Sequence, residues 1–360
     1  MKKILMVVEA LGGGVFTYVS QLSNDLSADF DVYVAYATRS QTPENFKDFF
    51  NPNVNLVEVK KFGNLKNIFS DIKVIKELRR IEEEIKPDII HLHSSIAGGF
   101  GRLAFKGKNN TVIYTPHGYS YLMVGENTFM GKMYKTMEKF LGKKNCITLT
   151  CCKSEEEEAK KFSENTAYIE TGVNLADLSA SLDNVYPVNR GEFTVYTLGR
   201  ICIQKQPQLF NQIAMLTPEA KFIWIGVGEL KDELKAPNIE ITGWKPRKDA
   251  LALAKGADIF ILCSLGEAIA MSLIEMMFIK KLCLVSNVVG NKDVIKNGIN
   301  GYVCNKAEEY SARIKQAIKE YPIDLPKKAY EDVLNIYNTN SMKEKYVQFY
   351  SNVDDGKYNK

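Results

Sequence analysis

Two carboxylates eight positions apart, Glu267 and Glu275, have surroundings that packing alone does not easily explain. They flank a transition from a strand-like run at 258–263 to an apolar, helix-like run that ends at Phe278. The N-terminus of a helix that follows a strand favours an anion, because its first N–H groups and its dipole point outward. Acids beside such a site suit the hydroxyls of a sugar or ribose attached to the anion. The alternative is an ordinary amphipathic helix with one solvated glutamate.

Glu275 is the less usual of the two acids. Its sequence neighbours from 273 to 279 are otherwise apolar, and a carboxylate in such surroundings is costly to bury unless it is hydrogen-bonded. Two cations, Arg200 and Lys205, follow the strand-like run 193–198. An arginine fork together with a lysine point charge would suit a diphosphate. Arg200 considered alone would more often be a surface residue.

Glycines and histidines follow strand-like runs in the first half. Gly12, Gly13 and Gly14 come after the apolar run 4–8 and lack the G-x-G-x-x-G spacing of a dinucleotide site, so they form either a flexible turn or a loop that a ligand approaches closely. His117 stands in a Pro-His-Gly turn, where a donor to a sugar or phosphate oxygen is expected. His91 and His93 share a strand face, but no nearby carboxylate completes a metal set, so no metal is predicted.

The segment 102–144 carries eight lysines and arginines against two acids. Within it, residues 129–141 form an amphipathic pattern whose apolar face holds Met130, Met133, Tyr134, Met137, Phe140 and Leu141. Such a helix can lie on an anionic membrane surface as a peripheral contact. The alternative is a helix that packs on its own domain with a solvated basic face. The acids 155–158 are expected to be a solvated first helical turn.

The composition is that of a globular protein with a core of normal size. A length of 360 residues predicts two domains, and a net charge of +4 gives no indication of nucleic-acid binding. The seven cysteines contain no C-x-x-C pair and are expected to be reduced core thiols of a cytoplasmic protein. The apolar run after Lys2 and Lys3 is too short for a signal peptide, and no run is long enough to cross a membrane.

Strands and helices alternate through both halves, which predicts α/β domains with doubly wound parallel sheets. Ligands of such sheets bind beyond the carboxyl ends of the strands. We expect an N-terminal Rossmann-like domain on the acceptor side at 1–176 and a linker at 177–191, where periodicity is lost. A nucleotide-sugar-binding domain is expected at 192–340, and a helix returning to the first domain at 341–360.

An ordered set of motifs resembles glycosyltransferase family 4. The set comprises Gly199-Arg200 with Lys205, the run 226–230, Thr242-Gly243-Trp244, the two acids of an E-x7-E motif at 267 and 275, and the runs 290–295 and 297–302. The glycines at 12–14 and the turn at His117 also fit the family's first domain. The resemblance implies a GT-B fold, with two Rossmann-like domains facing across a cleft. It also implies metal-independent transfer of a sugar from a nucleotide donor, with retention at the anomeric carbon.

The resemblance also implies roles for individual residues. Arg200 and Lys205 would bind the donor diphosphate, Glu267 would hold donor-sugar hydroxyls, and His117 would touch the sugar; these four form the expected catalytic set. The remaining expected donor-binding residues are Gly13, Gly14, Gly226, Gly243, Trp244, Ile269, Ala270, Met271, Leu273 and Glu275. Within that set, Glu275 would take the ribose hydroxyls and Gly243-Trp244 would lie near the base. The family usually has glycine where Ala268 stands.

The expected function is transfer from a nucleotide sugar, UDP-linked, to a lipid-linked or surface-glycan acceptor in capsule, O-antigen or related polysaccharide synthesis. No cofactor beyond this co-substrate is expected. Two other functions fit the same sequence features. A nucleotide-sugar epimerase of the same architecture would need no acceptor, and a two-lobed sugar-binding protein would show no chemistry; the clamp of Arg200 and Lys205 argues against the latter.

Overall fold

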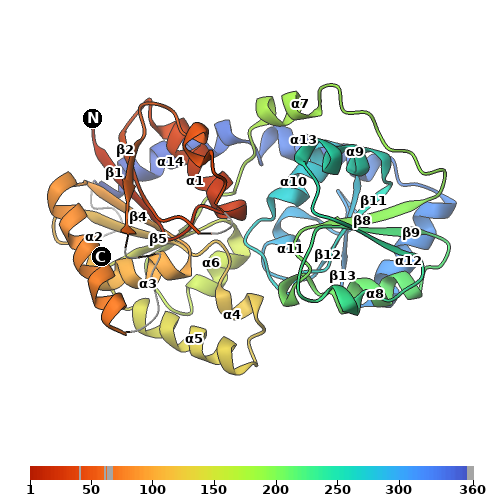
Figure 1. Ribbon diagram of the computed structural model, residues 1–360, viewed down its shortest axis with the longest axis horizontal. Coiled ribbons are helices and arrows are strands. Elements are labelled where there is room, and N and C mark those ends of the chain that lie inside the picture. Colours follow the sequence, from red (N-terminus) through yellow and green to blue (C-terminus); the bar gives the residue numbers. More distant parts are fainter. Residues whose placement is uncertain (40–41, 61, 63–67, 355–360) are drawn as a thin grey trace. The chain divides into compact units, whose positions relative to one another are not determined.

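The computed structural model describes residues 1–39, 42–60, 62 and 68–354, which fold into two α/β units (Figure 1). The first unit comprises Met1–Tyr121, Phe129–Thr171 and Thr339–Lys360, and the second comprises Leu122–Thr128 and Gly172–Asn338. Each unit contains one parallel sheet with helices on both faces, which confirms the predicted fold class. No helix in the described ranges combines the length and the apolar character that crossing a membrane would require.

The first sheet has seven parallel strands, and its interior strand β1 lies between β2 and β4. In spatial order the strands are β3 (Asn55–Glu58), β2 (Asp31–Tyr36), β1 (Lys3–Val8), β4 (Ile89–His93), β5 (Thr111–Thr115), β6 (Ile147–Thr150) and β7 (Thr166–Tyr168). The helices of this unit are α1 (Gly13–Leu26), α2 (Ile68–Ile85), α3 (Ser95–Ala104), α5 (Phe129–Leu141), α6 (Lys153–Ala159) and α14 (Thr339–Asp354). The short helix α4 (Ser120–Met123) runs across the division between the two units.

The second sheet has six parallel strands, and its central strands β8 and β11 are neighbours. In spatial order the strands are β10 (Ile239–Gly243), β9 (Lys221–Ile225), β8 (Thr194–Leu198), β11 (Ile259–Leu262), β12 (Leu282–Ser286) and β13 (Tyr302–Cys304). The helices of this unit are α7 (Leu175–Leu182), α8 (Pro207–Met215), α9 (Arg247–Gly256), α10 (Met271–Phe278), α11 (Asn291–Val294), α12 (Ala307–Lys319) and α13 (Asp324–Asn335).

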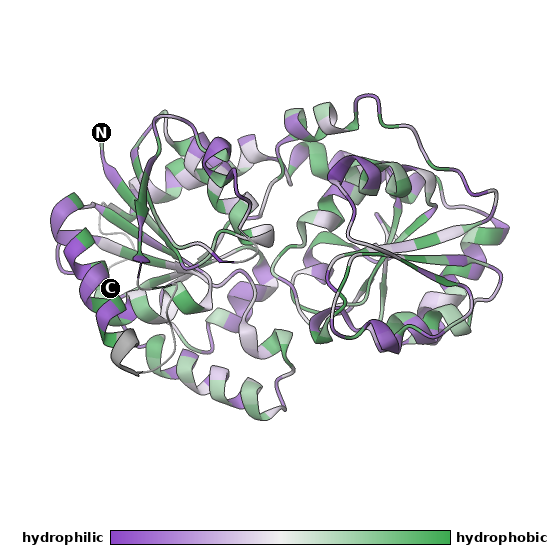
Figure 2. Cartoon of the chain, viewed as in Figure 1, coloured by the Kyte–Doolittle hydropathy of each residue, from purple (hydrophilic) through white to green (hydrophobic). Residues whose placement is uncertain are grey.

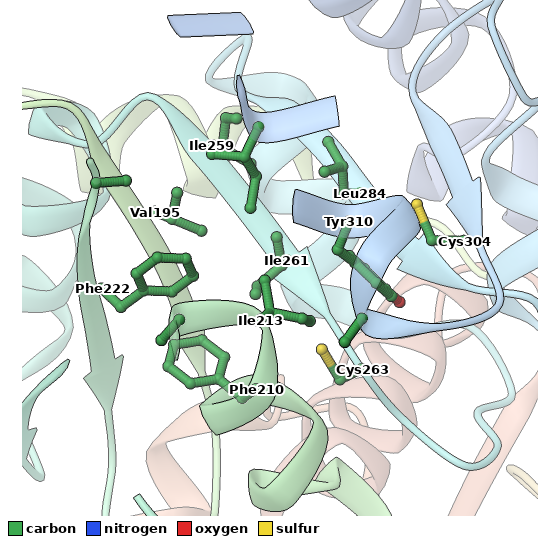
Figure 3. Packing of buried hydrophobic residues seen from close by; sticks show 14 of the residues in the cluster. Val195, Phe210, Ile213, Phe222, Ile259, Ile261, Cys263, Leu284, Cys304 and Tyr310 are labelled. Atoms are coloured by element: carbon green, nitrogen blue, oxygen red, sulfur yellow. The ribbon is translucent and has the colours of Figure 1, made fainter. Parts of the chain in front are cut away.

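The interior strands are buried and mostly apolar, because both faces of each sheet are covered. All four residues of β11 are buried, and successive side chains point to opposite faces. Figure 3 shows one face, where Ile259 and Ile261 meet Phe210 and Ile213 of α8 together with Tyr310 of α12. The rings of Phe210 and Phe222 pack edge to face with centroids 5.5 Å apart. This core holds β8 and β11 rigidly, and the predicted acids and cations lie in the loops that follow these two strands.

The connection between the two sheets differs from the expected linker at 177–191. Helix α7 occupies part of that range, and its N-cap is Asn174, whose side-chain oxygen accepts from the N–H groups of Ala176 and Asp177. Lys255 Nζ donates to the carbonyls of Leu182 and Val185, so the segment after α7 is fixed to the second unit. The division between the units falls at Thr171 and Gly172. An asparagine cap starts the helix where apolar periodicity is weak.

The C-terminal helix α14 belongs to the first unit and packs beside α1 (Figure 1). Two tyrosines anchor it in the interior of that unit. The hydroxyl of Tyr346 lies 2.6 Å from that of Tyr18, and the hydroxyl of Tyr350 lies 2.7 Å from His91 Nδ1. The end of the chain thereby contributes polar side chains to the core beneath the first sheet.

Candidate active site

In the second unit, the loops after β8 and β11 bring together one predicted cation and one predicted acid. The two strands pair in parallel, so their carboxyl ends lie at the same edge of the sheet. Lys205 Nζ donates to Glu267 Oε1 at 2.6 Å, and Ser264 Oγ donates to the same oxygen at 2.5 Å. Both hydrogen bonds fall on Oε1. The other oxygen of Glu267, Oε2, has no partner within the described part of the chain and can accept from a ligand hydroxyl.

Main-chain and amide hydrogen bonds join these two loops to each other. The N–H of Leu265 donates to the carbonyl of Gln204 at 2.8 Å, and Gln204 Nε2 donates to the carbonyl of Gly266 at 3.0 Å. Gln206 Nε2 donates to the carbonyl of Cys263 at 2.5 Å. The position of Lys205 relative to Glu267 is therefore set by the backbone. Neither Ser264 nor the two glutamines was predicted as a site residue.

The loops that carry this pair also contain a helix N-terminus and a second cation. Helix α10 begins after Ala270, which has an extended backbone and no side-chain cap, so the first turn is not capped by its own N-cap residue. Ile269 and Ala270 are buried, and Met271 is half-buried, so their backbone is what they offer to a ligand. Arg200, in the loop after β8, is exposed and makes no ion pair or hydrogen bond with any residue in the described ranges. Cations and helix N–H groups at one edge suit a diphosphate.

Two glycines allow close backbone contacts around this edge. A Cβ on Gly226 would lie 2.1 Å from the carbonyl oxygen of Gly199, and one on Gly290 would lie 1.8 Å from that of Ala268. Gly226 and Gly290 also have φ values of 149° and 84°, which side chains disfavour. Ala268 itself is not among the residues with positive φ, so its backbone conformation accepts a side chain. The turn therefore works without the glycine usual for the family at that position.

Glu275 lines a second part of the same unit, a cavity of about 280 Å³ that also borders Trp244 and Arg247. Arg247 Nη2 donates to Glu275 Oε1 at 2.8 Å. The carboxylate is thus stabilised by a cation that sequence reasoning did not identify, and it is not surrounded by apolar groups alone. Trp244 is mostly exposed and follows Gly243, whose φ is 73°. Leu273, another predicted donor-binding residue, is fully buried in α10 and contacts the core.

In the first unit, the three histidines stack at the carboxyl ends of β4 and β5, where His91 and His93 are fully buried and His117 is half-buried. His93 Nδ1 lies 3.0 Å from His117 Nε2, and His117 Nδ1 lies 3.6 Å from Cys151 Sγ. Both ring nitrogens of His117 therefore have protein partners, and a side-chain bond to a ligand would have to replace one of them. His93 Nε2 is buried without a partner among the residues described. The same residues contain no group of three or more His, Cys, Asp or Glu able to hold a metal ion.

Burial keeps this stack neutral at physiological pH. Desolvation lowers the pKa of His117 to about 3 and lowers the pKa values of His91 and His93 well below 6.5. The tautomer of His91 follows from its partners. Thr115 Oγ1 donates to the carbonyl of Leu149, so it accepts from His91 Nε2–H, and Tyr350 donates to His91 Nδ1.

The predicted glycine loop lies at the same edge of the first sheet, after β1. Gly13 needs its glycine for a φ of 58°, whereas a Cβ on either Gly13 or Gly14 would meet nothing within 4 Å. Glu9, which follows β1, accepts a hydrogen bond from Ser94 Oγ, which follows β4. Burial raises the pKa of the Glu9 carboxyl. The open space beside Gly13 and Gly14 leaves room for a ligand next to the backbone.

The acidic run after Ser154 differs from the solvated turn that was expected. Glu155 is fully buried and accepts from the N–H groups of Gly118 at 2.7 Å and Cys151 at 2.9 Å. Its carboxylate thereby fixes the turn that contains His117, whose φ is 54°. Glu158 accepts from the Tyr121 hydroxyl at 2.5 Å. The run looks solvated in the sequence because two of its hydrogen-bond donors, Gly118 and Tyr121, lie 37 residues away from their acceptors.

Helix α5 combines features of the two interpretations of the basic segment, a helix on a membrane surface and a helix packed on its own domain. It packs on its own unit through Gly131, Glu138 and Leu141 and leaves most of its apolar face exposed. Glu138 is buried because Arg102 donates to both of its oxygens, at 2.9 and 3.2 Å. Figure 2 shows apolar and polar residues alternating along this helix. Large apolar side chains and lysines therefore occupy the same exposed surface: Phe129, Met130, Met133, Met137 and Phe140, with Lys132 and Lys139.

Comparisons with known proteins agree with this architecture. Residues 12–177 match the family model described as Glycosyltransferase Family 4, and residues 180–333 match the one described as Glycosyl transferases group 1. An Escherichia coli UDP-Gal:alpha-D-GlcNAc-diphosphoundecaprenol alpha-1,3-galactosyltransferase is 27% identical over 66% of this chain and 67% of the relative. The Escherichia coli O-antigen biosynthesis glycosyltransferase WbnH is 24% identical over 86% of this chain and 88% of the relative.

Solved structures share the fold at low sequence identity. Sucrose-phosphate synthase from Thermosynechococcus elongatus superposes with a TM-score of 0.81 at 17% identity, covering 99% of this chain and 100% of that structure. HepE from Anabaena in complex with UDP-glucose gives 0.75 at 14% identity, covering 98% and 100%. The fold is GT-B. None of these four proteins is described as an epimerase, and that alternative receives no support.

Proposed function

The chain belongs to glycosyltransferase family 4 and is a glycosyltransferase, and we propose that it moves a sugar from a UDP-sugar to a lipid-linked diphosphate acceptor. The acceptor would be an intermediate of a bacterial surface polysaccharide, since relatives named for O-antigen synthesis match most of the chain. The reaction would occur at the cytoplasmic face of a membrane, with retention at the anomeric carbon and without a metal or other cofactor.

The pairing of Lys205 with Glu267 carries this proposal. When the bond from the anomeric carbon to the phosphate oxygen breaks, its electron pair stays on the diphosphate. Lys205, Arg200 and the first N–H groups of α10 would stabilise that charge. Glu267 holds the ammonium through Oε1 and would accept a donor-sugar hydroxyl at Oε2. The ribose would bind Glu275 and the base would lie near Trp244, in the cavity of about 280 Å³.

The first unit supports binding of an uncharged reacting group. A sugar hydroxyl carries no charge, and the edge near Gly13, Gly14 and His117 offers neutral imidazoles and backbone groups. The predicted contact of His117 with the donor sugar stays a prediction. Its left-handed backbone, fixed by Glu155, would present main-chain groups as well as the ring.

Helix α5 supports peripheral contact with an anionic membrane. Single exposed apolar side chains are common on protein surfaces, but a contiguous apolar patch rimmed by lysines marks an interaction site. The apolar group would enter the interface, and the lysines would contact phosphate headgroups. Flotation with vesicles of phosphatidylglycerol should carry the protein at low salt, and vesicles of phosphatidylcholine should not. Equal flotation with both lipids, or none with either, would refute this part.

The function is tested by pairing donor binding with product analysis. A panel of nucleotide sugars is screened for a rise in the melting temperature, because a ligand that binds only the folded state stabilises it. The stabilising donor is then incubated with and without GlcNAc-diphosphate-lipid, and products are separated. We expect a UDP-sugar to stabilise the protein and the acceptor to gain one sugar. Conversion of the donor to another nucleotide sugar without acceptor, or no shift with any donor, would contradict the proposal.

A further inference from the structure

A largely apolar cavity of about 860 Å³ lies within the first unit, between α2, α3 and α5. Its wall includes Ile75, Ile96, Phe100, Leu103, Met137 and Leu141. The volume falls within the range of about 300 to 1,000 Å³ that is usual for small-molecule sites. Neither the histidine stack nor the loop at Gly13 lines it, so the cavity is separate from the groups described above.

The cavity follows one face of α3 for most of its length. The lining residues of this helix are Ser95, Ile96, Gly99, Phe100 and Leu103. Eight positions at 1.5 Å each give a channel wall of about 12 Å. In the middle, Gly99 contributes no side chain, and a Cβ there would meet only Leu141 Cδ1, at 4.0 Å. An elongated apolar ligand would fit this shape.

The start of α3 has a different chemistry from its end. Ser95 Oγ lies 2.9 Å from Ser120 Oγ, and both residues line the cavity. Lys135 Nζ lies 5.4 Å from the ring centroid of Tyr121, another lining residue. The helix dipole adds positive potential at this point. The cavity therefore offers hydroxyl groups near Ser95 and apolar side chains near Leu103, which complements an amphiphile with a hydrogen-bonding head and a hydrocarbon tail.

We propose that this cavity binds the hydrocarbon chain of the lipid-linked acceptor, with the acceptor's phosphate at the Ser95 end. The proposal rests on the proposed function, from which the acceptor is taken. Helix α5 contributes both to the cavity wall and to the exposed apolar surface. A chain leaving the bilayer beside α5 can enter the cavity with little exposure to water. Burying the methylene groups of three isoprene units removes a large apolar surface from water, which favours binding.

The test varies both the length of the acceptor's hydrocarbon chain and the shape of the cavity. Two acceptors share one GlcNAc-diphosphate head and carry either a farnesyl chain or a single isoprene unit. Gly99→Leu fills the channel. We expect it to raise KM for the farnesyl acceptor at least about tenfold, the loss of two buried methylenes, and to leave the short acceptor within about twofold.

A matched pair on α5 keeps the test independent of folding. Met137→Ser and Met133→Ser make the same change on the same helix at exposures of 48% and 38%, but only Met137 lines the cavity. With acceptors dissolved in detergent and no bilayer present, Met137→Ser should weaken the farnesyl acceptor selectively, and Met133→Ser should not. Equal KM values for both acceptors in the wild type, or equal effects of both methionine variants, would overturn the proposal. A dimer in sedimentation that both variants dissociate would also overturn it, since the surface would then bind a second copy.

A direct binding measurement separates this proposal from the proposed function. If the wild type transfers sugar to neither acceptor, the proposed function fails, and calorimetry with farnesyl phosphate and with inorganic phosphate then tests the cavity alone. Binding of farnesyl phosphate that Gly99→Leu removes, without binding of inorganic phosphate, would support the cavity as a lipid-chain site. Binding of both ligands alike, or of neither, would refute it.

Discussion

The ligand-facing edges of the two sheets use opposite chemistry. In the second unit, Lys205 and Glu267 place opposite charges 2.6 Å apart beside a helix N-terminus, with Arg200 exposed nearby. In the first unit, His93 is buried and His117 is half-buried, desolvation lowers the pKa of both imidazoles, and the carboxyl of Glu9 has a raised pKa. A charged edge suits a ligand that gains negative charge as it departs. A neutral edge suits a hydroxyl that must keep its reactivity.

The difference follows from how buried charge is compensated. Glu267 is buried, with 10% of its side chain exposed against 17% for Lys205, and the ammonium of Lys205 compensates the charge of the carboxylate. The histidines lie behind the strand ends, where Tyr18, Tyr346 and Tyr350 surround them. A charged imidazolium there would lose its hydration without a carboxylate to compensate. The same position relative to a sheet therefore serves charge stabilisation in one unit and rigid positioning in the other.

The largest effect that we predict concerns the stability of the first unit in acid. All three histidines of the chain lie there, and their folded pKa values are below 6.5. As pH falls through 6.5, the unfolded chain takes up protons first, so stability is lost below that pH. Each histidine contributes up to about 1.4 kcal/mol per pH unit, or about 4 kcal/mol for three. The pKa of Glu9 is raised in the folded state, so its protonation stabilises the fold as the pH falls. This one group opposes the effect of the three histidines.

Two optical signals distinguish the units in this measurement. Both tryptophans, Trp224 and Trp244, are in the second unit, so their fluorescence reports that unit alone. Urea unfolding is followed at pH 7.5 and at pH 5.5. Lowering the pH should lower the urea midpoint of the first transition seen by circular dichroism, which we assign to the first unit. The urea midpoint seen by tryptophan fluorescence should fall by less. Equal falls in both signals would show that the buried histidines do not set the difference between the units.

The next largest effect tests the charged edge. Lys205→Ala removes a cation that would stabilise the departing diphosphate, and we expect kcat to fall about 100-fold or more, equivalent to about 3 kcal/mol. The melting temperature should also fall, because Glu267 is buried and keeps only Ser264 as a partner, so kcat is compared well below the melting transition. Lys248→Ala, on the exposed face of α9, is the control and should keep full activity. Loss of less than tenfold in Lys205→Ala would remove this residue from the catalytic set.

A smaller effect tests the packing behind the neutral edge. Tyr350→Phe removes the hydroxyl that donates to His91 Nδ1 and leaves a buried acceptor unpaired, at a cost of about 1 to 3 kcal/mol in the free energy of unfolding. Tyr330→Phe, a half-buried tyrosine of α13 in the second unit, should cost less than about 0.5 kcal/mol. Urea midpoints by circular dichroism compare the two. Similar values would mean that α14 is held by packing and not by this hydrogen bond.

Local pattern predicted much of this structure. Apolar runs marked the strands, and the polar residues after them marked the ligand edges, because side chains at the carboxyl ends of parallel strands converge. The local pattern could not predict the hydrogen-bond and ion-pair partners of those residues. Ser264 and Arg247 meet Glu267 and Glu275 only in the folded chain, and Glu155 binds N–H groups of a turn 37 positions away. The orientation of α5 also depends on a tertiary pair, because Arg102 draws Glu138 inward against the helix's own apolar pattern.

The smallest effect that we predict concerns Arg247. Its side chain pairs with Glu275, the carboxylate that is expected to bind the ribose hydroxyls. The arginine side chain is 55% exposed, so solvent screens the pair and it contributes about 0 to 1 kcal/mol. Removing it by Arg247→Ala should free Glu275 and change the Kd for UDP by no more than about fivefold. Glu275→Gln should weaken UDP by about tenfold, since ribose hydroxyls bond a carboxylate more strongly than an amide. Calorimetry with UDP measures both. A loss above tenfold in Arg247→Ala would mean that the guanidinium itself contacts the nucleotide, and the charged edge would then extend to the base cavity.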